Sequence, residues 1–188
     1  MEIVKTDIDG VVIIEPKIFW DDRGYFYESF SAREFADKVN PNVAFVQDNQ
    51  SFSSYGVLRG LHFQKPPHAQ SKLVRVIEGS VIDVAVDIRK GSPKFGKYVS
   101  VELTGENHRQ FFIPKGFAHG FVVVSETALF QYKCDNPYVP NAEGAIIWND
   151  PDINIDWGIS EQEAKLSAKD KLHGLLMDFD SPFIYGDY

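Results

Sequence analysis

Four side chains of the 188-residue sequence could together move a proton: His62, Lys72, Tyr132 and Asp170. Histidine is the side chain most often used as a general base, and a carboxylate beside it could orient the imidazole and raise its basicity. A fixed ammonium could stabilise a developing oxyanion, and a phenol could donate a proton. Singly, each residue has a commoner structural interpretation as a core histidine, a surface lysine, a buried tyrosine or a solvated aspartate. The functional hypothesis therefore requires a fold that gathers them.

His62 lies in residues 56–64, an apolar run interrupted by glycines. This run predicts a strand with functional side chains on one face. Alternate residues of an extended segment share a face. We therefore expect His62 to point inward together with Leu58, Gly60 and Gln64. Arg59 is expected to point the other way.

Short β-rich runs follow one another along most of the chain, each bounded by Gly, Pro, Asn or Ser. They cover residues 11–16, 24–30, 44–48, 57–64, 71–78, 80–88, 98–103, 109–113, 118–124, 128–134 and 144–148. Strands at this spacing are typical of a sandwich or barrel. A turn at residues 21–24 is expected to join the first two strands, and Ser31 is expected to cap a helix over residues 31–39. Residues 156–176 contain capping motifs that predict further helical turns.

Length and composition predict a single domain, residues 1–188, and exclude several classes of protein. Hydrophobic residues make up 44% of the sequence and charged residues 24%, and no apolar run is long enough for a membrane helix. A net charge of −8 argues against a nucleic-acid-coating protein but allows a small anionic ligand bound by local cations. The N-terminus lacks a secretory layout, and the single cysteine, Cys134, cannot form an internal disulfide, so we expect a cytoplasmic protein.

Two motifs resemble those of the cupin barrels, a jelly-roll class. Gly56 followed after five residues by His62 resembles the first cupin motif, and residues 114–119, which end at His119, resemble the second. Metal-binding cupins have a further histidine and a glutamate where this chain has Gln64 and Lys72. Because an ammonium repels a divalent ion and two histidines are too few for a typical site, we expect no metal there.

Seven blocks of the sequence, in order, resemble the signature blocks of the dTDP-4-dehydrorhamnose 3,5-epimerase family. They are residues 23–28, 47–51, 57–64, 70–74, 113–121, 132–134 and 167–170. The resemblance implies an all-β, jelly-roll or cupin-like barrel with a few short flanking helices. It also implies a homodimer without metal or cofactor that epimerises dTDP-4-dehydro-6-deoxy-glucose at C3 and C5, on the route to dTDP-L-rhamnose.

Matched motif by motif, the resemblance assigns a role to each site residue. His62 would be the general base, Asp170 its partner, Tyr132 the opposing acid and Lys72 the stabiliser of the enolate oxygen. The substrate-binding residues would be Arg23, Phe26, Glu28, Gln47, Asp48, Asn49, Arg59, Lys72, His119, Glu143 and Lys169. In this family the N-terminal strands can cross to the partner subunit, so Arg23, Phe26 and Glu28 could serve the neighbouring site.

The assigned roles agree with the chemistry, because protons next to a ketone become acidic only when the enolate is stabilised.

The sequence leaves three alternatives to a 3,5-epimerase. One is an epimerase that inverts a single carbon of a related dTDP-4-keto sugar. Another is a metal-dependent cupin enzyme, which His62 and His119 favour but Gln64 and Lys72 disfavour. The third is a non-catalytic carbohydrate-binding module, which would need no acid–base pair.

Overall fold

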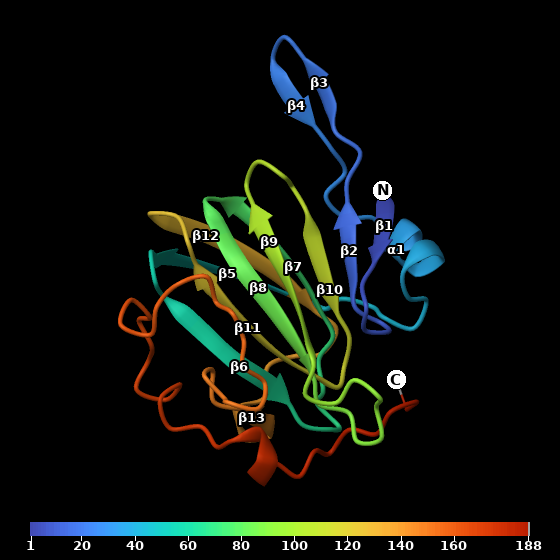
Figure 1. Ribbon diagram of the computed structural model, residues 1–188. Helices are drawn as coiled ribbons and strands as arrows, with labels where there is room; N and C mark the ends of the chain where they lie inside the picture. The colour runs from blue at the N-terminus through green and yellow to red at the C-terminus, as the bar shows by residue number, and fades with distance from the viewer. Residues whose placement is uncertain (188) are drawn as a thin grey trace.

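The structure, a computed structural model, describes residues 1–187 and consists mainly of two antiparallel sheets (Figure 1). One sheet contains, in spatial order, β1 (Glu2–Lys5), β2 (Val12–Glu15), β10 (Gln110–Ile113), β7 (Lys72–Glu78), β12 (Thr127–Cys134) and β5 (Gln47–Ser54). The other contains β13 (Glu143–Ala145), β6 (Leu58–Gln64), β11 (Phe117–Val123), β8 (Ser80–Asp87) and β9 (Tyr98–Thr104). A separate hairpin of β3 (Phe19–Asp21) and β4 (Gly24–Phe26) projects away from both sheets (Figure 1). The all-β fold class is confirmed.

Helical structure is confined to α1 (Ala32–Lys38) and two 3-10 turns, η1 (Pro140–Ala142) and η2 (Leu176–Asp178). The α1 helix begins as predicted, because the Ser31 side chain accepts a hydrogen bond from the backbone N–H of Glu34. Within residues 1–187 no helix is long and apolar enough to cross a bilayer.

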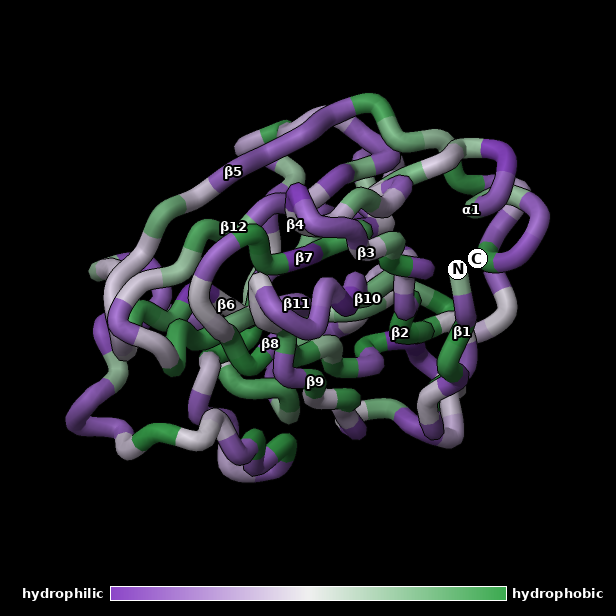
Figure 2. The backbone as a smooth tube through the Cα atoms, turned by 90° about the horizontal axis from the view of Figure 1, so that it is seen from above, coloured by the Kyte–Doolittle hydropathy of each residue, from purple (hydrophilic) through white to green (hydrophobic). Residues whose placement is uncertain are grey.

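The main hydrophobic core lies between the two sheets. Val74 and Phe130 from the six-stranded sheet belong to the same buried cluster as Ala85 and Phe121 from the five-stranded sheet. Figure 2 shows hydrophobic stretches gathered in the middle of the molecule and the hydrophilic edge strand β5 at its margin. Alternation in the strands produces this arrangement, since successive side chains point to opposite faces.

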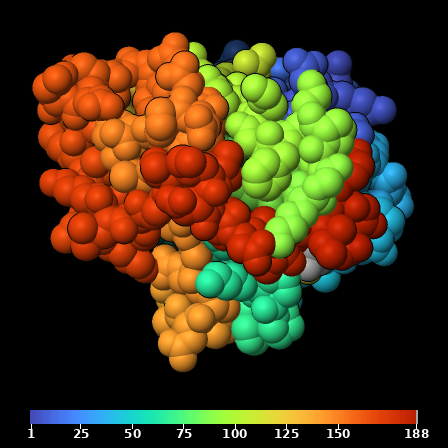
Figure 3. Space-filling view, turned by 60° about the horizontal axis from the view of Figure 1, so that its bottom comes forward, coloured from blue at the N-terminus to red at the C-terminus, as the bar shows by residue number. Residues whose placement is uncertain are grey.

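Each sheet is also covered on its outer side. The Trp148 and Trp157 side chains of the C-terminal segment pack with Leu58 and Leu61 of β6. Figure 3 shows the C-terminal part of the chain, in orange and red, spread over one face of the molecule. On the six-stranded sheet, Phe35 of α1 packs in a third, smaller cluster. The C-terminal segment is thus held against the strand that carries His62.

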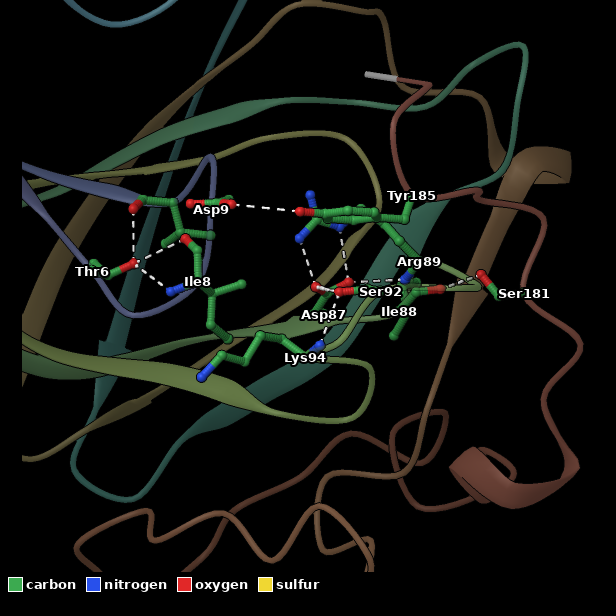
Figure 4. A network of polar contacts seen from close by, with 11 residues as sticks. Thr6, Ile8, Asp9, Asp87, Ile88, Arg89, Ser92, Lys94, Ser181 and Tyr185 are labelled. Atoms are coloured by element: carbon green, nitrogen blue, oxygen red, sulfur yellow. Dashed lines mark hydrogen bonds and ion pairs between the residues drawn. The ribbon is translucent and has the colours of Figure 1, made fainter.

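Ser181 and Tyr185 of the C-terminal segment lie against a buried ion pair at the end of β8 (Figure 4). The Arg89 guanidinium donates to both oxygens of Asp87, at 2.9 and 2.6 Å, and lies over the rings of Phe117 and Tyr185. The Ser181 hydroxyl donates to the Ile88 carbonyl. Pairing compensates the burial of both charges, and the contacts of Tyr185 with Arg89 and of Ser181 with Ile88 hold the C-terminal segment in place.

Several predicted elements differ from the structure, among them the strands expected at residues 24–30 and 144–148, which cover only Gly24–Phe26 and Glu143–Ala145. The turn at residues 21–24 joins β3 to β4, whereas β2 pairs with β1, which was not predicted, and with β10. The strand expected at residues 44–48 begins at Gln47 and continues to Ser54. Of the helical turns expected at residues 156–176, the structure has isolated turns and the start of η2 at Leu176, with no α-helix. Between the turns, the backbone of Lys165 pairs with Gly56 and Leu58 at the start of β6. The capping motif in this segment supports a single turn, whereas a stable helix needs further hydrogen-bonded turns after the first.

A β-bulge in β6 orients the strand that carries the candidate base. Between the cross-strand pairs His62–His119 and Arg59–Phe121, β6 contains two residues and β11 only one. The extra residue shifts the alternation by one, so Arg59 and His62 line the same hollow while Leu61 packs on the outer side. The prediction that Arg59 points away from His62 was wrong, since strict alternation assumes an unbroken ladder.

Gly60 permits this bulge. Its φ is +150°, and a Cβ atom at this position would lie 2.6 Å from the Cα of Gly120 on β11. Both the backbone conformation and the close approach therefore favour glycine.

We expect Gly60→Ala to lower the free energy of unfolding by about 1–3 kcal/mol, since it combines a strained φ with a backbone clash. Thermal denaturation measures the change. Gly174→Ala is the control, because a Cβ there meets no atom within 4 Å, and we expect it to stay within about 0.5 kcal/mol of the parent chain. Wild-type stability of Gly60→Ala would contradict the role of the bulge.

Candidate active site

Two adjoining polar hollows lie between the sheets, with volumes of about 360 and about 240 Å³. Both are lined by Asn49, His62, Lys72 and Tyr132. His62 comes from the five-stranded sheet, whereas Lys72 and Tyr132 come from the six-stranded sheet. The candidate base therefore faces the candidate acid and the ammonium from opposite walls.

His62 and Asp170 form a short hydrogen bond, 2.6 Å between Nε2 and Oδ1. Asp170 is only 4% exposed, and its second oxygen accepts a 2.7 Å hydrogen bond from the Ser167 hydroxyl. Burial lowers the pKa of His62, and the Asp170 carboxylate opposes that shift. Although burial acts to raise the pKa of Asp170, its hydrogen bonds from Ser167 and His62 lower it overall. The pair is thus a neutral imidazole oriented by an ionised carboxylate, with Nδ1 left as the second ring nitrogen.

Lys72 and Tyr132 lie on one face of the six-stranded sheet. The Lys72 Nζ is 6.0 Å from the centre of the Tyr132 ring, and no hydrogen bond from Nζ occurs within residues 1–187. Burial lowers the pKa of Lys72 and raises the pKa of Tyr132. Cys134, opposite Lys72 in the sheet, has a pKa raised to about 11 by burial and is therefore an inert thiol at neutral pH.

A polar rim surrounds the larger hollow. The Gln47 amide donates to Asn49 at 2.9 Å, and both side chains line this hollow. Glu143 accepts hydrogen bonds from the Lys169 ammonium and from the Tyr138 hydroxyl, the latter at 3.0 Å. Although burial acts to raise the pKa of Glu143, these two donors lower it overall.

The smaller hollow is lined by Arg59 and His119 as well. The Arg59 guanidinium donates to Ser53 at 3.3 Å. His119 Nε2 lies 2.9 and 3.0 Å from the two oxygens of Asp83, which is completely buried. Burial raises the pKa of Asp83, and the adjacent His119 opposes the shift. His119 is thus fixed by a partner in β8.

A model of the dTDP-4-dehydrorhamnose 3,5-epimerase family matches residues 5–178. The chain belongs to this family. It is 54% identical to the dTDP-4-dehydrorhamnose 3,5-epimerase of Salmonella typhimurium over 176 residues, which cover 94% of this chain and 96% of that protein.

Solved structures agree with this assignment. A dTDP-4-dehydrorhamnose 3,5-epimerase from Elizabethkingia anophelis superposes with a TM-score of 0.93 at 53% identity, covering 96% of this chain and 99% of that one. The dTDP-6-deoxy-D-glucose-3,5-epimerase from Legionella pneumophila, solved with dTDP-4-keto-L-rhamnose, gives 0.91 at 54% identity, covering 95% and 94%. These neighbours confirm the jelly-roll fold predicted for the epimerase, and they support a nucleotide-sugar substrate.

Three predicted substrate-binding residues of the epimerase lie outside the hollows of their own chain. Arg23, at the tip of the projecting hairpin, has an 89% exposed side chain and pairs with Asp21 at 2.5 Å (Figure 1). Phe26 is 70% exposed, and together with Glu28 it lines a separate groove of about 340 Å³ beneath the hairpin. One chain by itself therefore does not bring these residues to His62.

Asp48 also lies away from the site. It follows Gln47 in β5, so it points to the opposite face, where both of its oxygens accept hydrogen bonds from Lys133. Of the matched block at residues 47–51, Gln47 and Asn49 line the larger hollow, and Asn49, Gln50 and Ser51 line the smaller one.

Three residues near the site were not predicted from the sequence. Asp83 is a carboxylate within the apolar run 81–86 of β8, a signal that a buried partner exists. Tyr138 lines the larger hollow and carries no local signal. His173 lies three positions after Asp170, and its Nε2 is 3.6 Å from the Asp170 carboxylate.

We expect Asp170→Asn to reduce kcat/KM by up to the ~10²–10⁴-fold that positioned proton transfer contributes. Because Asp170 raises the pKa of His62, its removal should also move the acid limb of the pH profile to lower pH. The profile of kcat/KM against pH measures both effects. Asp48→Asn makes the same chemical change outside the hollow and should leave the profile unchanged. An unshifted acid limb in Asp170→Asn would contradict the assigned pairing.

Proposed function

We propose that this epimerase inverts dTDP-4-dehydro-6-deoxy-α-D-glucose at C3 and C5 to give dTDP-4-dehydro-β-L-rhamnose, with His62 as the general base. The 2.6 Å hydrogen bond between His62 and Asp170, in a hollow shared with Lys72 and Tyr132, carries this proposal. Relatives more than half identical over nearly the whole chain are named 3,5-epimerases, which favours inversion of both carbons over one.

The proposed reaction needs three groups around the sugar ring. His62 takes the proton from the carbon next to the C4 ketone, and the electron pair of that C–H bond forms a C=C bond as the C4 oxygen becomes an enolate. The Lys72 ammonium stabilises this oxygen. Tyr132 then gives its phenolic proton to the same carbon from the opposite wall, and the enolate returns to a ketone. Proton exchange with water restores both side chains before the second carbon reacts.

The directions of the pKa shifts suit these roles. A lowered pKa keeps His62 neutral and able to accept a proton at neutral pH. A raised pKa keeps the Tyr132 phenol protonated and able to donate. Burial works against the Lys72 ammonium, but the negative charges of Asp83 and Glu143 favour it, as an enolate in the hollow would.

The diphosphate of the nucleotide is an anion and must be bound by cations. Because the chain has a net charge of −8, these cations must be gathered at the binding site. Arg59 lines the smaller hollow, and a guanidinium can hold phosphate oxygens in a bidentate arrangement. Lys169 lies at the rim through its ion pair with Glu143. Binding energy from this remote group can hold the sugar while its ring is remodelled.

A second copy of the chain completes the proposed site. The projecting hairpin exposes Phe19, Trp20, Tyr25 and Phe26, an aromatic surface that favours cover by another subunit. In the proposed homodimer, Arg23 of the partner subunit lies beside the nucleotide. Sedimentation of the protein as a single chain would contradict this arrangement.

We also infer a cytoplasmic location, which the single cysteine favours.

We expect His62→Ala to abolish deuterium incorporation at C3 and C5 when the enzyme is incubated with dTDP-4-dehydro-6-deoxy-glucose in heavy water. General base catalysis is worth roughly 10²–10⁴-fold, and loss of the only base could cost more. NMR measures the exchange, and calorimetric titration with dTDP should show nearly unchanged binding in the folded variant. Substantial deuterium exchange in folded His62→Ala, or none in the parent enzyme, would contradict the proposal.

Tyr132→Phe should separate proton removal from inversion. Because the variant keeps His62 but lacks the opposing phenol, deuterium should still enter the substrate while inverted product forms much more slowly. A tyrosine that only packs in the core would instead let both rates fall together or leave both unchanged. One NMR time course records both, and inversion of C5 at the parent rate would eliminate Tyr132 as the acid.

A further inference from the structure

The imidazole of His173 has a buried nitrogen without a hydrogen-bond partner in the part of the chain that the structure describes. This Nε2 atom lies 3.6 Å from Asp170 Oδ1, the oxygen that also accepts the hydrogen bond from His62. The His62 and His173 rings meet edge to face at 5.8 Å between centres. An orphan polar atom at such a position calls for a physical explanation, and an ion is one of the few available.

The three side chains form a set of donors suited to a transition metal. One ligand atom from each of His62, Asp170 and His173 can be chosen so that all lie within 4.8 Å of one another. Ligands held about 2 Å from a tetrahedral ion lie roughly 3.3 Å apart, so small side-chain movements would suffice. Two imidazoles and one carboxylate with an open fourth position are the donor set of many zinc sites.

We propose that His62, Asp170 and His173 form an inhibitory Zn²⁺ site that switches the epimerase off by occupying its base. The rest of the chain supports such a site. Ser167 already holds the second oxygen of Asp170 at 2.7 Å, as outer-shell partners do in metal sites. The side chains of His62 and His173 keep 30% and 14% of their surface exposed, so an ion from solvent can reach the cluster.

The inhibition follows from the two nitrogens of His62. Without metal, Nε2–H donates to Asp170, and the lone pair on Nδ1 is the base. An ion bound at Nε2 needs the lone pair of that nitrogen, so the ring proton must move to Nδ1. No lone pair then remains for the substrate proton.

This site differs from the metal position of the cupin barrels. At that position Gln64 and Lys72 replace two ligands, and neither residue takes part in the cluster proposed here. Only His62 is common to both. The other two ligands come from the C-terminal segment, six and three residues before Leu176 of η2. The epimerisation itself uses no metal in this scheme.

The inhibition rests on the proposed function, whereas metal binding can be tested apart from it. Full-length protein freed of metal with EDTA is titrated with Co²⁺, whose visible absorption reports coordination by imidazole and carboxylate. Zn²⁺ affinity is measured by competition with a chromophoric chelator. We expect one ion per chain, loss of deuterium exchange in proportion to occupancy, and recovery with EDTA.

The decisive variant is His173→Gln, with His173→Asn as the alternative if the first melts at lower temperature. Metal-free His173→Gln should exchange deuterium like the parent enzyme. Its affinity for Zn²⁺ should fall by more than ~10–100-fold, which is the loss expected when only an outer-shell partner is removed. His68→Gln is the matched control, because His68 is exposed and lies outside the cluster, and it should stay fully sensitive to Zn²⁺.

Several results would overturn the proposal. Undiminished Zn²⁺ affinity in His173→Gln would place the ion elsewhere, and full exchange at saturating Zn²⁺ would show that the base stays free. Loss of exchange in metal-free His173→Gln at unchanged melting temperature would make His173 part of the proton path instead. A parent enzyme without exchange in the absence of metal would refute the proposed function alone, since the Co²⁺ spectrum would still test the site.

Discussion

The hydrogen bond between His62 and Asp170 is the interaction on which the active site depends, and it joins positions 108 residues apart. His62 belongs to β6, whereas Asp170 belongs to a turn of the C-terminal segment. The bond therefore forms only when that segment is held against β6, where the backbone of Lys165 pairs with Gly56 and Leu58. Trp148 and Trp157 of that segment pack with Leu58 and Leu61 of β6, and this packing indirectly orients the imidazole.

The two-sheet architecture supplies the second requirement of an epimerase, which is access to both faces of a carbon atom. A base alone can only return a proton to the face from which it came. His62 and Tyr132 come from opposing sheets and line the same hollow, so the proposed mechanism places the substrate between a proton acceptor and a proton donor. Burial of both side chains moves their pKa values apart, which keeps each in the protonation state that its role requires.

The same closeness that makes the pair effective also makes it open to a competing ligand. A carboxylate that accepts from one imidazole and lies near a second presents both nitrogens to a metal ion. The reaction and the proposed inhibition thus use a single atom, Nε2 of His62, in two ways. In the first its N–H donates a hydrogen bond to Asp170, and in the second its lone pair binds Zn²⁺.

The sequence by itself determined the family, the all-β class and the capped helix, because motif residues, strand periodicity and the Ser31 cap are encoded locally. It also named His62, Lys72 and Tyr132, whose types and motif positions do not depend on exact register. Only the tertiary structure decided that Arg59 shares a face with His62, that Asp48 points outward, and that His173 approaches Asp170. A bulge breaks the local period, and contacts between distant segments arise from packing, so neither can be read from residue spacing.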